Sequence, residues 1–169
     1  FEQYNTMKPG NQAPDIAFAT KAGEARKGFQ QQAKSLYAIK STYKLVTFWA
    51  SWCAHCMQEL PQLQTLYPKL QEKDMEVIAI SLDTDETAYQ NAIQNHPWVA
   101  YCDFKKWNSP AVLEYYVFST PSFYLLDENN SILKKINSVA QLEAILQTGL
   151  PWLRQTVYTH WSSMLLRCR

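Results

Sequence analysis

Residues 44–56 read KLVTFWASWCAHC, an apolar run that ends in two cysteines three positions apart. The run is rich in β-branched and aromatic residues, which favours a buried strand. From Cys53 to about Glu72, leucines and a tyrosine recur at spacings of three and four, the pattern of one face of an amphipathic helix. The two cysteines therefore lie where a buried strand leads into a helix.

That position predicts the chemistry of the cysteine pair. If Cys53 begins the helix, Cys56 lies one turn further along the same face, within the ~4.4–6.8 Å Cα separation of an unstrained disulfide. The free amide groups and the positive end of the helix dipole stabilise a thiolate, so we expect a lowered pKa for Cys53 and an attacking role. Cys56 is expected to be the resolving thiol. A protonated His55 between them would favour the thiolate further.

The remaining elements alternate between strands and helices. In order, a strand, a helix, a short helix, two strands and a helix are expected at residues 75–82, 83–95, 109–116, 122–126, 131–136 and 138–149. Residues 98–107 are expected to form a loop with a short strand, and residues 13–18 alternate like an edge strand. The pattern predicts an α/β fold with a mixed sheet and helices on both faces.

Composition excludes several classes of function. The chain has 169 residues and a net charge of +1, which favours one domain and lacks the basic excess of nucleic-acid-binding proteins. Its four glycines are too dispersed to build a phosphate-binding loop, and no apolar run approaches the ~18 residues of a membrane span. We therefore expect neither nucleic acid nor nucleotide as a partner.

The two ends of the chain differ from its centre. Phe1 is preceded by no leader, which favours a chain cut from a longer precursor. We expect a folded domain over 1–150, with an N-terminal extension at about 1–43 and a core at about 44–149. The basic segment 151–169 has three arginines and no acidic residue. It fits a terminal helix packed on the domain, a docking helix for a partner or a membrane surface, or a segment foreign to the domain.

Several motifs together resemble the thioredoxin superfamily. They are residues 46–56, Pro61 five positions after the second cysteine, and Thr120-Pro121 before a later strand. Ala13-Pro14-Asp15 and Glu59-Leu60-Pro61 are similar to the TlpA/ResA branch of bacterial thiol-disulfide oxidoreductases, which are membrane-tethered or periplasmic. The insert at 103–110 is similar to thioredoxin-like domains of Bacteroidetes. The resemblance implies a three-layer α/β/α sandwich around a central mixed sheet, and an extracytoplasmic location.

The resemblance also implies further site residues. Pro121 matches the cis-proline that faces the two cysteines, and Thr120 would offer backbone groups to an extended substrate. Glu59 matches a carboxylate near the active cysteines, one turn beyond Cys56, where it can exchange protons with the resolving thiol. Thr47 replaces the buried aspartate of other thioredoxins and cannot take up a proton. The acid-base role therefore passes to Glu59.

Each candidate also has a plainer interpretation. Trp52 and His55 flank the cysteines and are candidates for substrate contact, but Trp52 could simply pack at the rim, and His55 could only tune the reduction potential. Glu59 could be a solvated helix residue. Structural zinc would need two more ligands, and the remaining cysteines and histidines have no paired metal spacing: Cys102, Cys168, His96 and His160. We expect no metal and no cofactor beyond the dithiol, with Cys102 and Cys168 unpaired or joined as a second disulfide.

These observations favour a thiol-disulfide oxidoreductase that reduces or exchanges protein disulfides outside the cytoplasm. Its expected partners are protein thiols and disulfides, with apocytochromes as candidate substrates, and an electron-donor redox protein at the membrane. One alternative is a thiol peroxidase, although the Pro-x-x-x-Thr-x-x-Cys setting of its cysteine is absent. The other is a non-catalytic binding or structural module of a larger envelope protein.

Overall fold

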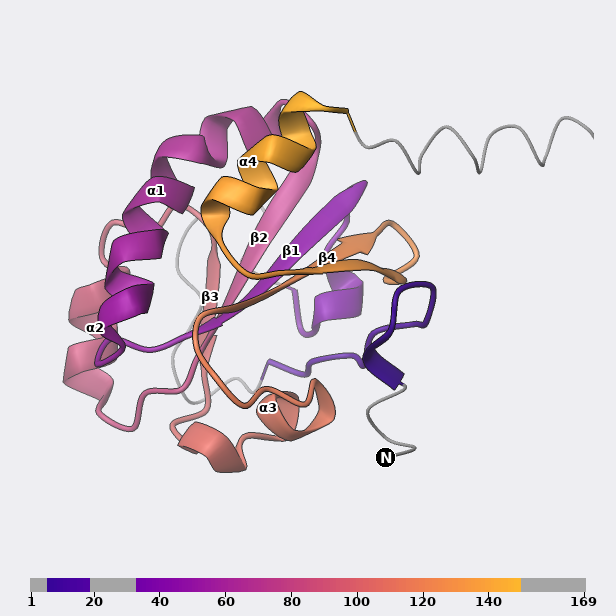
Figure 1. Ribbon diagram of the computed structural model, residues 1–169. Coiled ribbons are helices and arrows are strands. Elements are labelled where there is room, and N and C mark those ends of the chain that lie inside the picture. The colour runs from indigo at the N-terminus through magenta and orange to yellow at the C-terminus, as the bar shows by residue number, and fades with distance from the viewer. Residues whose placement is uncertain (1–5, 19–32, 150–169) are drawn as a thin grey trace, which may run out of the picture.

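One mixed β-sheet forms the centre of the molecule (Figure 1). The structure is a computed structural model that describes residues 6–18 and 33–149. In this part of the chain five strands pair in the order β3-β2-β1-β4-β5. The β1 strand is parallel to β2 and antiparallel to β4, β2 is parallel to β3, and β4 is antiparallel to β5. The strands are β1 Tyr43–Trp49, β2 Met75–Ser81, β3 Val99–Cys102, β4 Ser122–Asp127 and β5 Ile132–Ile136.

Helices cover both faces of this sheet. The described helices are α1 Ala54–Gln71, α2 Glu86–Ile93, α3 Pro110–Glu114 and α4 Val139–Gln147, with short 3-10 turns η2 Leu36–Ala38 and η3 Lys106–Asn108. Adjacent rings in β1 point to opposite faces: Trp49 lies 6.5 Å from the ring of Tyr89 in α2, and Phe48 lies 5.2 Å from the ring of Tyr115, directly after α3. The predicted three-layer α/β/α sandwich is confirmed.

The β1 strand is central because it is apolar on both faces. All seven of its residues are buried, as expected for a strand covered on both sides. The α1 helix then packs one leucine stripe inward, and it continues through Pro61 and Pro68. The buried leucines are Leu60, Leu63, Leu66 and Leu70. The strand and helix predicted around the two cysteines are therefore present, within a residue or two at each end.

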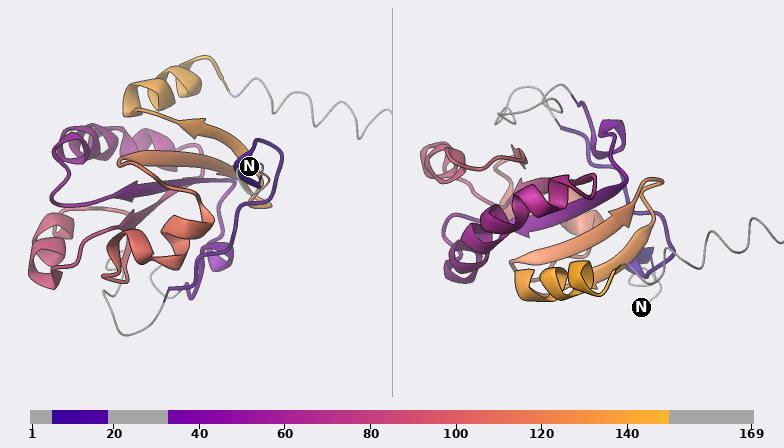
Figure 2. Two further views of the ribbon diagram at one scale, coloured as in Figure 1. Left: turned by 60° about the horizontal axis from the view of Figure 1, so that its bottom comes forward. Right: turned by 90° about the horizontal axis from the view of Figure 1, so that it is seen from above.

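One of the two expectations for the less regular segments is wrong. Residues 99–102 form the short edge strand β3, fully buried against β2, within the stretch expected to be a loop with a short strand. The edge strand expected at 13–18 is absent, because Ala17 makes only an isolated bridge with Ser35. In Figure 2 the indigo N-terminal segment lies beside the turn of the β4–β5 hairpin, where the Gly10 amide donates to the Ile132 carbonyl at 2.8 Å.

The basic segment 151–169, with Cys168 and His160, lies outside the described residues. Its interpretations as a packed helix, a docking helix or a foreign segment remain predictions. Among the described residues, no helix has the length and apolar character needed to cross a membrane.

A histidine is buried in the aromatic part of the core. His96 is only 7% exposed and lies between Trp49 and Trp98, with ring centroids 5.2 Å and 4.9 Å away. Burial lowers its pKa from 6.5 to about 4, because a charged imidazole loses its hydration there. The folded protein therefore keeps His96 neutral at a pH where the unfolded chain protonates it.

We expect His96 to make the fold acid-sensitive. As the pH falls from about 6.5 to about 4, proton uptake by the unfolded state removes up to about 3 kcal/mol of the unfolding free energy. Urea unfolding of wild type and His96→Phe at pH 7.5, 5.5 and 4.5 gives the unfolding free energy of each protein as a function of pH. The contribution of His96 is the difference between the two slopes of free energy against pH. A His96→Phe variant that loses stability towards acid as steeply as wild type would contradict the assignment.

Candidate active site

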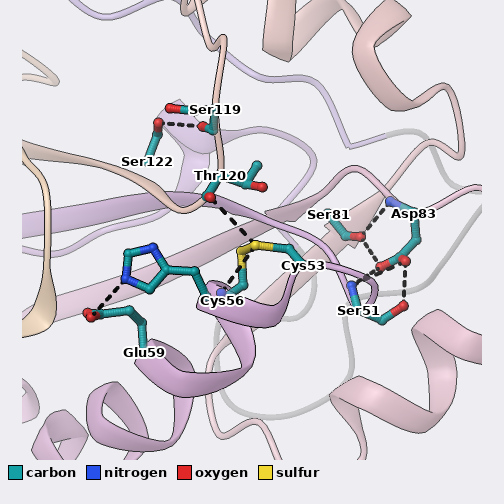
Figure 3. Close-up of a disulfide and its surroundings, with 10 residues drawn as sticks. Ser51, Cys53, Cys56, Glu59, Ser81, Asp83, Ser119, Thr120 and Ser122 are labelled. Carbon is teal, nitrogen blue, oxygen red and sulfur yellow. Dashed lines mark hydrogen bonds and ion pairs between the residues drawn. A yellow bond between two sulfur atoms is a disulfide. The ribbon is translucent and has the colours of Figure 1, made fainter.

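Cys53 and Cys56 form a disulfide at the N-terminus of α1 (Figure 3). Their Cα atoms are 5.2 Å apart, within the predicted range. Cys53 is the N-cap residue, and the backbone amide of Cys56 donates to its Sγ at 3.2 Å. Cys53 is 9% exposed, whereas Cys56 is fully buried. Of the two residues, only Cys53 therefore keeps exposed surface from which an incoming thiol or disulfide can approach.

The loop before β4 lies against this sulfur. The carbonyl oxygen of Thr120 is 3.5 Å from Cys53 Sγ, although the two residues are 67 positions apart in the chain. The Thr120-Pro121 peptide bond is cis, and both residues are half-buried. The loop position implied by the resemblance is therefore the one found, with Thr120 directed at the disulfide in Figure 3.

Glu59 is a buried carboxylate that joins two helices. Glu59 is only 8% exposed, so it is not a solvated helix residue. One carboxylate oxygen accepts a hydrogen bond from the amide of Val139, the first residue of α4, at 2.6 Å. The other lies 3.5 Å from Nε2 of the largely exposed His55. The active-site helix is thereby tied to the N-terminus of α4, where a negative charge is favoured.

Asp83 is a site residue that the sequence pattern did not reveal. It falls at the start of the helix expected at 83–95, but the N-cap of α2 is Asp85, which accepts from the Ala88 amide at 2.7 Å. Asp83 is instead buried beside the turn that precedes Cys53 (Figure 3). It accepts from the amide of Ser51 at 3.0 Å and from the hydroxyls of Ser51 and Ser81 at 2.6 Å each. The end of β2 thus fixes the turn that leads from β1 to Cys53.

The two tryptophans near the cysteines have different surroundings. Trp49 is fully buried in the core, whereas Trp52 is 50% exposed beside Cys53. The ring of Trp52 lies 6.5 Å from that of Trp107, and Lys106 Nζ lies 5.1 Å from its centroid. Lys106 and Trp107 belong to the insert at 103–110, and sequence reasoning assigned them no role. Trp107 is 55 positions from Trp52 in the chain, so only the folded chain shows that they meet.

In the described part of the chain, the one remaining cysteine forms no disulfide. Cys102 is a free, fully buried thiol, and burial raises its pKa from 9.0 to about 11. Cys168, its candidate partner, lies outside the described residues.

Thr47, in place of an aspartate, is buried, and its hydroxyl has no hydrogen-bond partner among the described residues. No group of three or more metal-ligating side chains is present in the described ranges.

Comparison with known proteins assigns the family. A family model described as thioredoxin-like matches residues 41–132, from just before β1 to the start of β5. The chain belongs to the thioredoxin-like family. It is 27% identical over 154 residues to a thiol-disulfide oxidoreductase ResA from Bacillus cereus, an alignment that covers 89% of this chain and 84% of the relative. It is 29% identical over 133 residues to the thioredoxin-like protein YneN from Bacillus subtilis, covering 75% and 69%.

Solved structures share this fold. A thiol:disulfide interchange protein from a Bacteroides species superposes with a TM-score of 0.70 at 24% identity, over 85% of this chain and 90% of that protein. The thioredoxin domain of a thiol-disulfide oxidoreductase from Bacteroides vulgatus gives 0.69 at 23% identity, over 83% and 96%. The predicted family and fold are confirmed, and the relatives class this member of the family with the thiol-disulfide oxidoreductases.

We expect the cysteines to differ strongly in reactivity once the disulfide is reduced. Cys53 should alkylate first, because it is the one of the three residues that keeps exposed surface and because its sulfur lies at a helix N-terminus. Cys56 should follow slowly, and Cys102 should react only after unfolding. Timed iodoacetamide labelling with peptide mass spectrometry gives the order. Labelling of Cys102 in the folded protein as fast as Cys53 would contradict the described burial.

Proposed function

We propose that the protein exchanges disulfides with other proteins through Cys53 and Cys56. The observation that carries this proposal is a disulfide whose first cysteine, at a helix N-terminus, keeps exposed surface and whose second cysteine is fully buried. A structural disulfide would gain nothing from this asymmetry. A pair that must be attacked at one sulfur and resolved by the other requires it.

In the proposed reductive cycle, the thiolate of Cys53 attacks a substrate disulfide. A mixed disulfide forms, and one substrate sulfur leaves as a thiolate that takes up a proton. The thiolate of Cys56 then attacks the Cys53 sulfur, closes the internal disulfide and releases the second substrate thiol. Two electrons pass from the protein to the substrate, and the reverse sequence oxidises a dithiol. The exchange needs no cofactor beyond the dithiol.

Exposed apolar surface around the disulfide supports a protein substrate. The large exposed hydrophobic side chains of the described part are Trp52, Met57, Trp107, Leu113 and Phe118. Trp52 and Met57 lie in the turn and first helical turn around Cys53, Trp107 contacts Trp52, and Phe118 is two residues from Thr120. We propose that an extended substrate segment lies over this surface and pairs with the backbone of Thr120.

Glu59 is proposed to manage the proton of the resolving thiol. It lies one turn beyond Cys56 on α1 and is buried, so it faces little competition from bulk water. Val139 and His55 fix its carboxylate in place. The carboxylate can then accept the Cys56 proton as that thiol becomes the nucleophile, while His55, when protonated, favours the Cys53 thiolate.

The location and the partners of the protein are proposed from its resemblance to the TlpA/ResA branch. This resemblance supports an extracytoplasmic protein that receives electrons from a redox partner at the membrane, with apocytochrome thiols as candidate substrates. Residues 1–150 are proposed as one folded domain with its core at 44–149, and the last described helix ends at Gln147 within it.

The two active-site cysteines should have separable roles. Cys53→Ser should abolish reduction of protein disulfides such as insulin, and Cys56→Ser should accumulate a mixed disulfide on Cys53, visible by mass spectrometry and non-reducing electrophoresis. Cys102→Ser is the matched control and should keep full turnover. An unchanged rate in Cys53→Ser, with no adduct in Cys56→Ser, would support the non-catalytic module instead.

Glu59→Gln should slow the resolving step rather than the attack. Loss of a positioned base lowers such a step by about a hundredfold or more, and the defect should shrink as the pH rises and Cys56 ionises unaided. Glu72→Gln, a carboxylate at the other end of α1, is the matched control. Stopped-flow kinetics of mixed-disulfide decay measures the step. Equal pH profiles for both variants would contradict the role of Glu59.

A further inference from the structure

The insert at 103–110 brings a cation and an indole to the rim of the disulfide. Lys106 and Trp107 belong to η3, and both side chains are exposed. The ammonium of Lys106 lies 5.1 Å from the centre of the Trp52 ring, and the Trp107 ring lies 6.5 Å from it. Trp52 directly precedes Cys53. We refer to Trp52, Lys106 and Trp107 as the lysine–tryptophan edge.

The backbone of this insert is held in an unfavourable conformation. Phe104 has φ 59° and Lys106 has φ 54°, in the left-handed region that residues with a Cβ rarely adopt. Phe104 has a packing reason, because its ring lies 5.7 Å from that of the buried Tyr89. Lys106 is exposed, and the contact shown for its side chain is with Trp52. Strain that serves a contact beside the reacting sulfur is typical of functional positions.

The positive charge of the insert has no carboxylate partner in the described ranges. The ion pairs found there join His55 to Glu59 and Lys69 to Glu143, and neither involves Lys105 or Lys106. The nearby Asp103 accepts from the backbone amide of Lys105. A carboxylate placed over the lysine–tryptophan edge would therefore meet a cation that no acidic side chain of the described protein neutralises.

We propose that the lysine–tryptophan edge selects substrate segments that carry an acidic residue next to the reactive cysteine. This inference rests on the proposed disulfide exchange and names the class of segment that the site takes. When the substrate cysteine reaches Cys53, with its backbone beside Thr120, the neighbouring residue lies over Trp52. Its carboxylate accepts a hydrogen bond from the Lys106 ammonium, and its methylene groups pack between Trp52 and Trp107. Lys106 is a specificity-determining residue that takes no part in the bond changes.

The test uses peptides with one cysteine joined by a disulfide to 2-mercaptoethanol. The peptides differ only in the residues flanking the cysteine, which are Glu, Gln or Lys. The second-order rate of reduction by the reduced protein is divided by the rate of the same peptide with dithiothreitol, which removes differences in intrinsic reactivity. We expect the Glu peptide to react about three to ten times faster than the Gln peptide at low salt, and the difference to shrink at high salt.

Variants at Lys106 show whether the charge of this residue causes the preference for the Glu peptide. K106E should invert the order, so that the Lys peptide reacts fastest, and K106Q should abolish the preference. K69E is the matched control. Lys69 is exposed on α1, the helix that begins at Cys53, but lies 16 residues from Cys53, roughly 24 Å along the helix axis. The control should keep the wild-type order.

The outcomes separate the two proposals. Equal normalised rates for all peptides, or the same Glu-to-Gln ratio in wild type and K106E, would overturn the inference and leave disulfide exchange intact. No reduction of any peptide above the rate of Cys53→Ser would overturn the proposed function and the inference with it.

Discussion

The active site depends on one interaction, the capping of α1 by the sulfur of Cys53. Because the amide of Cys56 donates to that sulfur, the first cysteine stays at the end of the helix, where it keeps some exposed surface, while the second enters the buried face of the helix. The same geometry brings the two sulfurs within bonding reach and leaves amide groups to stabilise a thiolate. A cysteine one residue earlier or later would lose one of these properties.

The sheet order explains how this cap is held. The β1 strand lies between β2 and β4, so the ends of both neighbours reach the turn that carries Cys53. From β2 comes Asp83, which accepts hydrogen bonds from Ser51. From the loop before β4 comes Thr120, against the sulfur, and Glu59 ties the same helix to α4. Three elements distant in sequence, namely the end of β2, the loop before β4 and α4, therefore hold this turn and its helix, which suits a site that must keep its geometry in both redox states.

Much of this could be predicted from local sequence, because the decisive signals are local. The apolar run of β1, the leucine stripe of α1 and the spacing of Cys53 and Cys56 identify the strand, the helix and the dithiol. The position of Thr120-Pro121 came only from resemblance to a family, since spacing alone cannot bring residues 67 positions apart together. Asp83 was missed because a carboxylate after a strand also fits a helix cap. The lysine–tryptophan edge was missed because its members meet only after folding.

The most direct test of the central claim is an equilibrium titration of the Cys53–Cys56 disulfide in glutathione buffers, followed by mass spectrometry of trapped thiols. We expect a single two-electron transition, confined to these two cysteines, with a midpoint between about −270 and −120 mV, the range of disulfide-exchange proteins. Cys102 should remain a thiol throughout. A pair that stays oxidised below about −300 mV would be a structural disulfide and would contradict an exchange function.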